Sequence, residues 1–248
     1  MPRFFAPSEG IDEAGGAITL VGRDARHIAL SLRMAEGDEL VVSDGRSREY
    51  LCRLVRIRED ECRLEILKSE DGRGESPAQI TLYMAYPKGD KLEVVVQKAV
   101  ELGAAAIVPF VSERCIKRPV EGREEKQTAR LRAIANEAAG QCGRSVLPTV
   151  SSAMSFDAML KDAANNELTL FCYEGERCRS LKSVLRSARG ARTIGVIVGS
   201  EGGFSPREAE RAEEAGAISV SLGERILRCE TAPDYCLSAI SYELELGE

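Results

Sequence analysis

Alternating and short continuous runs of apolar residues fill the chain up to about Glu70, and turn-forming residues separate them. This pattern is typical of β-strands, which we predict at 18–21, 39–43, 49–57 and 62–67. One helix interrupts them, from Asp24 as its N-cap to about Met34. The arrangement predicts a small β-barrel.

Gly, Pro and charged residues gather at 69–77 without apolar periodicity. A segment of this composition is typical of an exposed linker. We therefore predict an N-terminal domain at 1–72 and a C-terminal domain at 78–248.

From Ala78 onward, apolar strands alternate with amphipathic helices, which indicates a mainly parallel sheet covered by helices on both faces. One helix is predicted at 90–102 from its apolar residues at helical spacing. Another begins with the capping box Ser205-Pro206-Arg207-Glu208 and ends at Gly216. The predicted strands are 80–86, 105–111, 168–173, 193–198 and 218–222.

The last helix is predicted to begin at Thr231, whose hydroxyl can cap it, and to continue to about Leu246 before Gly247. It carries two apolar stripes, and one sheet face can cover only one of them. We therefore expect a second subunit, as in a homodimer, to cover the other. The stripes are Tyr235, Ala239, Tyr242 and Leu246, and Leu237, Ile240 and Leu244.

The composition describes a soluble globular protein with 44% hydrophobic and 30% charged residues. No apolar run approaches the ~20 residues of a membrane-spanning helix, and no signal peptide precedes the first strand, so a cytoplasmic location without membrane partners is expected. Eight cysteines show no Cys-x-x-Cys spacing, and His27 is the single histidine. Zinc sites that need two imidazoles are thereby excluded, and we expect no metal.

Two glycine-bearing turns, each after an apolar strand, are the most informative feature. Gly199-Ser200-Glu201-Gly202-Gly203 is neither a Walker loop nor Gly-x-Gly-x-x-Gly. Glu201 in this turn, and Glu224 and Glu230 in the second segment, would repel phosphate oxygens. The turns suit a cationic ligand such as S-adenosylmethionine, although glycine is also needed by ordinary turns and the first turn alone leaves both interpretations open.

The second segment, Ser221–Ala232, places Ile226 and Leu227 beside Arg228, Glu230 and Thr231. This mixture is too apolar for an ordinary surface loop and too charged for a core. Apolar walls with a few polar groups are typical of a small-molecule pocket. We expect the two segments, which follow the strands at 193–198 and 218–222, to form one cleft at the carboxyl ends of neighbouring strands.

Taken together, Val198–Ser205 and Leu222–Ala232 resemble the C-terminal motif pair of the RsmE family, the SPOUT-class methyltransferases that modify N3 of a uracil in small-subunit ribosomal RNA. Further segments resemble the family in the same order, so the likeness covers nearly the whole chain. The family usually has proline where Ser200 stands, and serine there loses the fixed φ. The further segments are Arg3–Phe5, His27–Arg33, Lys88–Lys91, Gln97–Gly103, Ser112–Cys115 and Glu137–Arg144.

This resemblance implies a PUA-like RNA-binding β-barrel, followed by an α/β domain with a SPOUT-like parallel sheet and a C-terminal trefoil knot. It implies an S-adenosylmethionine cofactor, a homodimer, and ribosomal RNA or the assembled small subunit as the partner. Cofactor contacts are expected at Glu174, Gly199, Glu201, Gly203, Leu222, Gly223, Ile226, Leu227, Thr231 and Ala232. RNA contacts are expected at Arg3, His27, Arg33, Lys88, Lys98, Arg114 and Arg144.

The net charge of −6 is unevenly distributed. Residues 110–148 hold eight Lys and Arg against five Glu, whereas residues 200–248 hold four Arg against eleven acids. The basic segment can contact phosphates, although a solvated helix face explains Arg130 and Arg132 better. From the residues alone, a structural histidine on a small helix explains His27 better than a role in catalysis does.

Methylation of uracil N3 requires removal of an imide proton. We expect Arg228 to donate hydrogen bonds to a uracil carbonyl as charge develops there, with Glu230 or Glu201 as candidate proton acceptors. A catalytically inactive RNA-binding protein of the same fold and an α/β enzyme acting on a small metabolite are the alternatives.

Overall fold

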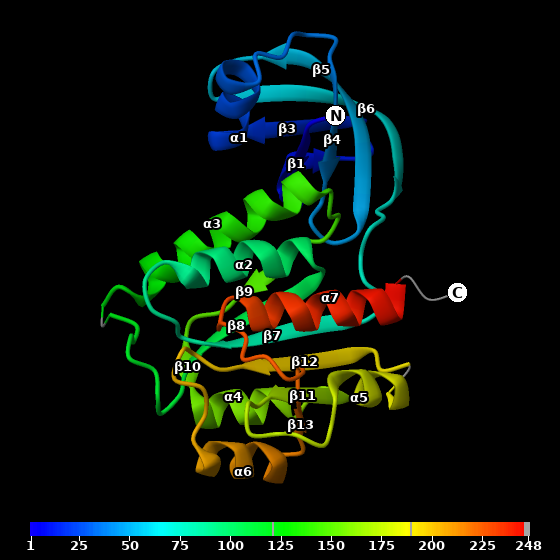
Figure 1. The fold of residues 1–248 in the computed structure, drawn as a ribbon. Coiled ribbons are helices and arrows are strands. Elements are labelled where there is room, and N and C mark those ends of the chain that lie inside the picture. Colours follow the sequence, from blue (N-terminus) through cyan, green and yellow to red (C-terminus); the bar gives the residue numbers. More distant parts are fainter. Residues whose placement is uncertain (121, 189, 246–248) are drawn as a thin grey trace. The chain divides into compact units, whose positions relative to one another are not determined.

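The computed structural model describes residues 1–120, 122–188 and 190–245. It contains two compact units, coloured along the chain in Figure 1. One comprises Met1–Glu75 with Ala139–Leu147, and the other Ser76–Ala138 with Pro148–Glu248. The continuous division predicted from the sequence leaves 139–147 in the C-terminal domain, whereas the structure groups this segment with the N-terminal unit.

A six-stranded sheet with the order β1-β4-β5-β6-β3-β2 forms the N-terminal unit. Its pairs are antiparallel except for β1 with β4, which is parallel. The four predicted strands are confirmed as β3 to β6, while the short β1 and β2 were not predicted. The bounds are β1 Arg3–Phe5, β2 Ile11–Asp12, β3 Ala17–Val21, β4 Glu39–Ser43, β5 Arg48–Ile57 and β6 Glu61–Asp71.

Strand β6 extends into the segment predicted to be a linker, because Asp71 still pairs with Arg48 of β5. The helix of this unit is shorter than predicted: α1 spans Arg23–Arg26 and continues as one π-helical turn, His27–Ser31. Asp24 as the N-cap is wrong. Gly22 occupies that position with φ 65°, a conformation that glycine adopts readily, and no side chain caps the helix.

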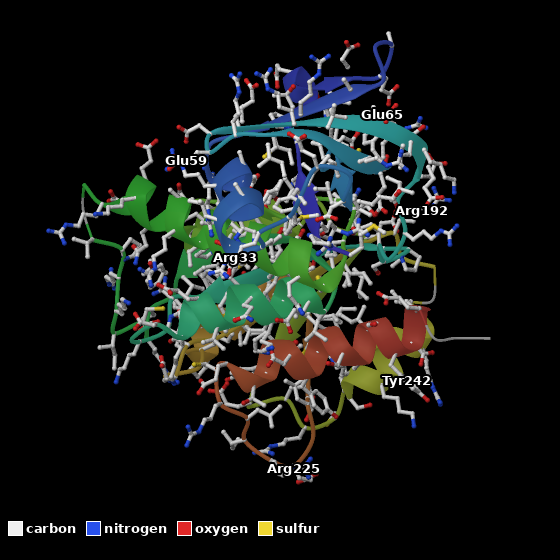
Figure 2. The ribbon with its side chains drawn as sticks, turned by 90° about the horizontal axis from the view of Figure 1, so that it is seen from above. Arg33, Glu59, Glu65, Arg192, Arg225 and Tyr242 are labelled. Atoms are coloured by element: carbon white, nitrogen blue, oxygen red, sulfur yellow. The ribbon has the colours of Figure 1, made fainter. Side chains whose placement is uncertain are left out.

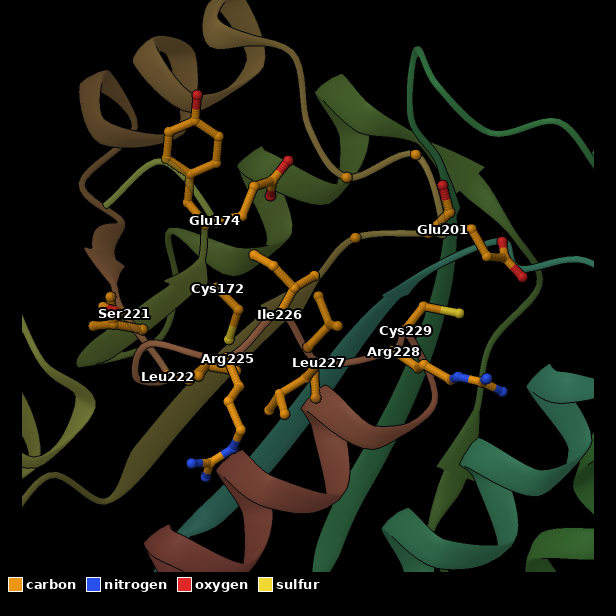
Figure 3. Close-up of a pocket in the computed structure, with 18 of the residues that line it drawn as sticks. Cys172, Glu174, Glu201, Ser221, Leu222, Arg225, Ile226, Leu227, Arg228 and Cys229 are labelled. Atoms are coloured by element: carbon orange, nitrogen blue, oxygen red, sulfur yellow. The ribbon is translucent and has the colours of Figure 1, made fainter. Parts of the chain in front are cut away.

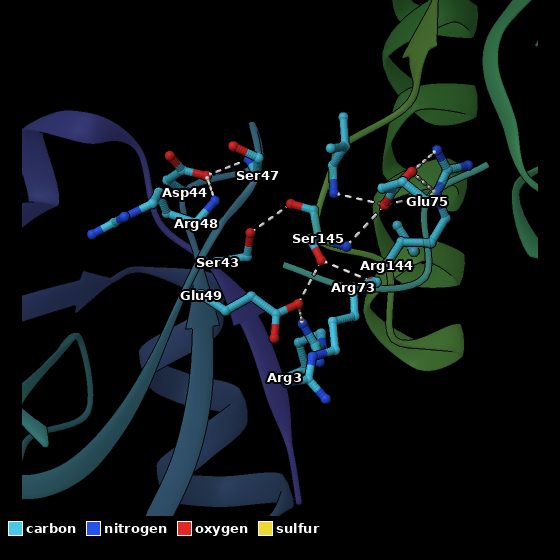
Figure 4. A network of polar contacts seen from close by, with 12 residues as sticks. Arg3, Ser43, Asp44, Ser47, Arg48, Glu49, Arg73, Glu75, Arg144 and Ser145 are labelled. Carbon is cyan, nitrogen blue, oxygen red and sulfur yellow. Dashed lines mark hydrogen bonds and ion pairs between the residues drawn. The ribbon is translucent and has the colours of Figure 1, made fainter. Parts of the chain in front are cut away.

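Segment 139–147 is fixed to the N-terminal sheet by buried polar contacts (Figure 4). The Ser43 hydroxyl donates to the Ser145 carbonyl oxygen at 2.6 Å, and the Ser145 hydroxyl donates to Glu49 at 2.5 Å. Glu75 accepts from the Arg144 guanidinium at 2.7 Å and from the backbone amides of Ser145 and Val146, both at 3.0 Å. These contacts satisfy polar groups that burial would otherwise leave without partners.

The C-terminal unit is built on a parallel sheet with the order β10-β8-β7-β12-β11-β13, and β9 also pairs with β8. The five predicted strands are confirmed as β7, β8, β11, β12 and β13. Fully buried apolar side chains fill β7, β11 and β12, as expected for a sheet covered on both faces. The bounds are β7 Gln79–Ala85, β8 Ala104–Val111, β9 Thr149–Val150, β10 Met154–Ser155, β11 Leu168–Cys172, β12 Thr193–Val198 and β13 Ile218–Val220.

Helices of the C-terminal unit follow the predicted apolar faces. Helix α2 buries Leu92, Val95, Val96, Ala99 and Val100. The capping box that begins α6 is confirmed, with Pro206 in the first turn. The bounds are α2 Lys91–Glu101, α3 Glu124–Cys142, whose residues from Ala139 belong to the N-terminal unit, α4 Phe156–Ala163, α5 Leu181–Ser187, α6 Pro206–Glu214 and α7 Thr231–Glu245.

Helix α7 has one buried and one exposed apolar stripe. Leu237 and Ile240 are fully buried, whereas Tyr235 is 45% and Tyr242 71% exposed. Figure 2 shows Tyr242 at the surface of this helix. The predicted helix end at Leu246 and Gly247 lies outside the described residues.

None of the helices in the described part of the chain has both the length and the apolar character needed to cross a membrane.

We expect Glu75→Ala to lower the free energy of unfolding of the N-terminal unit by about 3 kcal/mol, because it leaves the buried Arg144 guanidinium and two amides without their carboxylate. Urea denaturation followed by circular dichroism measures the loss. Asp60→Ala is the matched control, because the side chains of the Arg26–Asp60 pair are 57% and 71% exposed and a solvent-exposed pair contributes little to stability. Equal losses in the two variants would contradict the structural role of Glu75.

Candidate cofactor pocket

A pocket of about 490 Å³ lies at the carboxyl ends of β11, β12 and β13 (Figure 3). Open α/β sheets bind their ligands at this edge, and the volume suits a drug-sized molecule. The expectation that the strands before the two glycine segments are neighbours is wrong, because β11 lies between β12 and β13. The end of β11 therefore supplies a third wall, with Cys172, Tyr173 and Glu174.

The first glycine turn follows β12 and is anchored by the residue after it. Phe204 is 1% exposed, and its ring lies 4.3 Å from that of Phe171, centroid to centroid. The Gly203 amide donates to the Ser200 carbonyl at 2.9 Å and closes the turn. Gly203 has φ 61°, and a Cβ there would lie 2.2 Å from a carboxylate oxygen of Glu174. Only glycine therefore lets the backbone lie against Glu174.

The second segment runs from β13 to α7. Figure 3 shows Ile226 and Leu227 between Glu174 on one side and Arg228 with Cys229 on the other. Ile226 is 76% exposed, which is unusual for an isoleucine that lines a pocket. The Arg228 carbonyl accepts from the amides of Thr231 and Ala232 at 2.9 and 3.0 Å. The backbone of Arg228 is thus fixed to the first turn of α7.

Lys91, the first residue of α2, joins the two glycine segments. Its ammonium lies 3.1 Å from Glu201 of the first segment and 3.0 Å from Glu230 of the second. The Lys88 amide also donates to both carboxylate oxygens of Glu201, at 3.2 and 3.3 Å. One cation therefore holds two carboxylates that would repel each other.

These contacts shift the protonation equilibria of the three groups. A hydrogen bond from its own backbone amide, aided by Lys91 and Cys229, lowers the pKa of Glu230 to about 2 against the opposing effect of burial. Burial acts to raise the pKa of Glu201, but backbone hydrogen bonds and Lys91 outweigh it and lower that pKa. Hydrogen bonds to Glu230 and Glu201 raise the pKa of Lys91. All three groups are therefore charged at neutral pH.

Lys91 also changes the expected charge of the pocket. The sequence predicts Glu201 and Glu230 as negative charge available to a cationic ligand, but Lys91 compensates both carboxylates. Within residues 1–120, 122–188 and 190–245, Glu174 is the pocket-lining carboxylate without an ion pair. A cationic ligand would therefore meet the carboxylate of Glu174.

Nine of the ten expected cofactor residues line this pocket, and Thr231 does not. Lys91 and Ser200 line it as well, although sequence reasoning did not select them. Two features of the sequence could have identified them, because Lys91 belongs to a segment that resembles the family and Ser200 lies within the glycine turn. The nine residues are Glu174, Gly199, Glu201, Gly203, Leu222, Gly223, Ile226, Leu227 and Ala232.

Some of the expected RNA-binding side chains form ion pairs within the protein. Arg3 forms an ion pair with Glu49, and the Arg144 side chain is 5% exposed beside Glu75. Lys98 pairs with Glu101. These contacts favour structural roles for the three cations.

Other candidate RNA contacts are exposed. In the C-terminal unit, the Arg114 guanidinium donates to the Gly202 carbonyl at 3.2 Å, so this cation lies against the first glycine turn. Lys88 also lies beside this turn, because its backbone amide donates to Glu201. In the N-terminal unit, His27 packs edge-on against Phe4. Arg33, labelled in Figure 2, has φ 51°, the left-handed conformation that non-glycine residues rarely adopt.

No group of three or more His, Cys, Asp or Glu side chains in the described ranges is arranged to hold a metal ion.

Comparisons with known proteins agree on one family. A family described as RNA methyltransferase domain matches residues 74–241, and one described as RNA methyltransferase PUA domain matches residues 20–67. Ribosomal RNA small subunit methyltransferase E of Bacillus subtilis is 33% identical, covering 99% of this chain and 98% of its own. The protein of the same name from Synechocystis is 32% identical, covering 98% and 78%.

Solved structures are similar over almost the whole chain. Ribosomal RNA small subunit methyltransferase E from Neisseria gonorrhoeae, bound to S-adenosylmethionine, has a TM-score of 0.86 at 33% identity and covers 98% of this chain and 97% of its own. A putative methyltransferase from Legionella pneumophila, in complex with the same cofactor, has a TM-score of 0.84 at 28% identity, with 96% of both chains covered. These likenesses confirm the predicted fold class, a PUA-like domain followed by a parallel α/β methyltransferase domain.

We expect Lys91→Met to lower the free energy of unfolding at neutral pH, because Glu201 and Glu230 would then repel each other without a cation. The depressed pKa values stabilise the protein fully above about pH 4.5, and this contribution is lost as the pH falls toward 2. The difference between Lys91→Met and the unaltered protein should therefore be largest at pH 7 and shrink at pH 3. Urea titrations at pH 7, 5 and 3 measure it.

Lys98→Met is the matched control, since Lys98 lies on the same helix and pairs with the single carboxylate of Glu101. Its effect should be smaller at every pH. A loss for Lys91→Met that is constant from pH 7 to 3 would contradict the proposed charge arrangement.

Proposed function

This chain belongs to the RNA methyltransferase family that includes ribosomal RNA small subunit methyltransferase E, and we propose that it methylates N3 of a uridine in 16S ribosomal RNA. The methyl donor is S-adenosylmethionine. Ribosomal RNA is the substrate class that the relatives' names support. We propose the small subunit, free or assembled, as the partner and the cytoplasm as the location.

The pocket built from the two glycine segments is the observation that carries the proposal. Its volume of about 490 Å³ and its apolar wall at Ile226 and Leu227 fit an adenosine. Glu174, which has no ion pair in the described part of the chain, can face the positive charge of the cofactor. The backbone at Gly203 lies against this carboxylate, which only glycine allows. The residues present therefore fit S-adenosylmethionine.

The bound cofactor supplies an electrophilic methyl group, and the chain must make uracil N3 nucleophilic. We propose that Arg228 donates hydrogen bonds to a uracil carbonyl and stabilises the charge that develops as N3 loses its proton. Arg228 is exposed and has no carboxylate partner within the described ranges, so its guanidinium is available to a substrate. Its backbone is fixed by the first turn of α7, which limits its possible positions.

Glu230 and Glu201 are less suited to accept the N3 proton than the sequence suggested. A carboxylate with a pKa near 2 is a weak base at neutral pH. Both carboxylates already bind Lys91, and protonation would break those ion pairs. We therefore propose that Glu230 and Glu201 position Lys91 and the two glycine segments, while Arg228 has the main role at the base.

For RNA binding, we propose Arg114 and Lys88 beside the first glycine turn and His27 and Arg33 in the N-terminal unit. We further propose a homodimer in which a second copy covers the exposed stripe of α7. Sedimentation of the purified protein tests the oligomeric state.

Small ribosomal subunits incubated with this protein and methyl-labelled S-adenosylmethionine should acquire label on a single uridine of 16S ribosomal RNA. Mass spectrometry of the digested RNA identifies 3-methyluridine, and protein-free 16S RNA in a parallel reaction shows whether the assembled subunit is required. Cofactor binding without label in RNA would favour the inactive RNA-binding protein. Label in a small metabolite would favour an α/β enzyme that acts on a small metabolite.

Arg228→Ala should reduce the rate of methyl transfer about 100-fold or more, the usual cost of removing a donor that stabilises a transition state. The affinity for S-adenosylmethionine should stay nearly unchanged, so calorimetry and the labelling rate separate the two effects. Arg225→Ala is the matched control on the same segment, and Figure 3 shows Arg225 and Arg228 pointing in different directions. A wild-type rate for Arg228→Ala with bound cofactor would refute this mechanism.

A further inference from the structure

A second cavity, of about 500 Å³, lies at the carboxyl ends of β8 and β10, at the edge of the parallel sheet. Both strands are labelled in Figure 1. This end of the strands is where α/β sheets bind their ligands. None of the residues proposed to bind the cofactor lines this cavity. Its apolar wall consists of Val111, Pro119, Ala153 and Met154.

Glu113 is the carboxylate that lines this cavity, and its internal contacts use only one of its two side-chain oxygens. Its Oε2 atom accepts from the Ser205 hydroxyl at 2.8 Å, and its backbone amide donates to Glu208 at 2.8 Å. Glu113 is exposed, and no cation pairs with it within residues 1–120, 122–188 and 190–245. The carboxylate is therefore held in place and still able to accept a hydrogen bond.

Two exposed arginines accompany this carboxylate. Arg118 lines the second cavity, and Arg207 lines a smaller cavity of about 280 Å³ that also includes Glu113. Neither arginine forms an ion pair in the part of the chain that the structure describes. Arg211 differs, because it pairs with Asp157 at 2.6 Å. The site thus combines an apolar wall, one available carboxylate oxygen and two available guanidinium groups.

A short segment separates this cavity from the cofactor pocket. Gly202 lines the cofactor pocket, and Ser205, three residues later, holds Glu113. Three residues span at most about 11 Å. The Arg114 guanidinium donates to the Gly202 carbonyl at 3.2 Å, and a Cβ on Gly202 would lie 2.9 Å from the Arg114 carbonyl oxygen. An RNA strand whose target base enters the cofactor pocket can therefore reach the second cavity with a nearby nucleotide.

We propose that the second cavity binds an unpaired base close to the target uridine in the same strand, and that Glu113 accepts a hydrogen bond from the amino group of that base. Proteins recognise single-stranded RNA by taking up unstacked bases and reading their hydrogen-bonding edges. A carboxylate offers acceptors only, so it favours cytosine, adenine or guanine, whose amino groups uracil lacks. Arg118 and Arg207 bind the neighbouring phosphates. The inference rests on the proposed function in that the substrate is RNA.

Glu113→Met tests the base contact, because methionine has a similar length and only a weak acceptor. The KM for small ribosomal subunits should rise about tenfold, as expected for the loss of a contact that discriminates between bases. The affinity for S-adenosylmethionine, measured by calorimetry without RNA, should stay within about twofold. This result would separate the second cavity from the cofactor pocket.

Glu210→Met is the matched control, since Glu210 is exposed on α6 and has no ion pair in the described ranges. Removal of either carboxylate reduces the repulsion of RNA phosphates. A purely electrostatic role therefore predicts an unchanged or lower KM in both variants. A base contact predicts a higher KM for Glu113→Met alone.

The salt dependence of KM tests the two arginines. Replacing both, Arg118→Ala and Arg207→Ala, should lower the slope of log KM against log salt concentration by about 1.4, because each phosphate contact with a single strand contributes about 0.7. Arg186→Ala is the matched control: this arginine of α5 is exposed and lines neither cavity. Its slope should equal that of the unaltered protein.

A photo-crosslinker identifies the occupant directly. Ala153→p-azidophenylalanine places an aryl azide at the wall of the cavity. Irradiation with small ribosomal subunits should crosslink it to 16S ribosomal RNA, at a nucleotide close to the methylated uridine. Crosslinks to a ribosomal protein or to a second copy of this chain, without RNA, would overturn the proposal. This measurement does not depend on whether Glu113→Met folds.

An unchanged or lower KM for folded Glu113→Met would also overturn the base contact. Equal salt slopes for the double arginine variant and for Arg186→Ala would overturn the phosphate contacts. Failure of the unaltered protein to methylate RNA would instead refute the proposed function. The two failures are therefore distinguishable.

Discussion

The ion pairs of Lys91 are the interaction on which the cofactor pocket depends. The segments after β12 and β13 each bring a carboxylate to Lys91, and its ammonium group offsets the repulsion between these two carboxylates. Lys91 can reach both because it begins α2, which follows β7, the neighbour of β12. Three strands and one helix start are therefore joined at one ammonium group.

This arrangement explains which parts of the site the sequence could predict. Period-two and helical apolar patterns located β7, β8, β11, β12 and β13, and the capping box located α6, since these features are local. The glycine segments were identified for the same reason. The order of the strands is not local, so the position of β11 between β12 and β13 and the compensation of Glu201 and Glu230 by Lys91 were not predicted.

In the N-terminal unit too, the sequence predicts local patterns but not contacts between distant segments. Its four longer strands follow from the sequence, but β1 and β2 have three and two residues, too few for a periodic signal. Segment 139–147 belongs to this unit through hydrogen bonds to side chains about 70 to 100 positions away in the sequence. Arg144 is expected to contact RNA because it lies in a segment that resembles the family, and neither this resemblance nor the local charge distinguishes a buried ion pair from an exposed cation.

The low pKa of Glu230 constrains the proposed activation of a uracil in this pocket. A group that has lost its proton by pH 7 and prefers to remain ionised gains little by accepting one from an imide. The alternative is to make the imide more acidic, which requires positive charge near its carbonyl oxygens. Lys91 is occupied by two carboxylates, whereas Arg228 also lines the pocket and its guanidinium has no carboxylate partner in the described part of the chain. We therefore propose two separate roles: Lys91 holds the two glycine segments together, and Arg228 acts on the base.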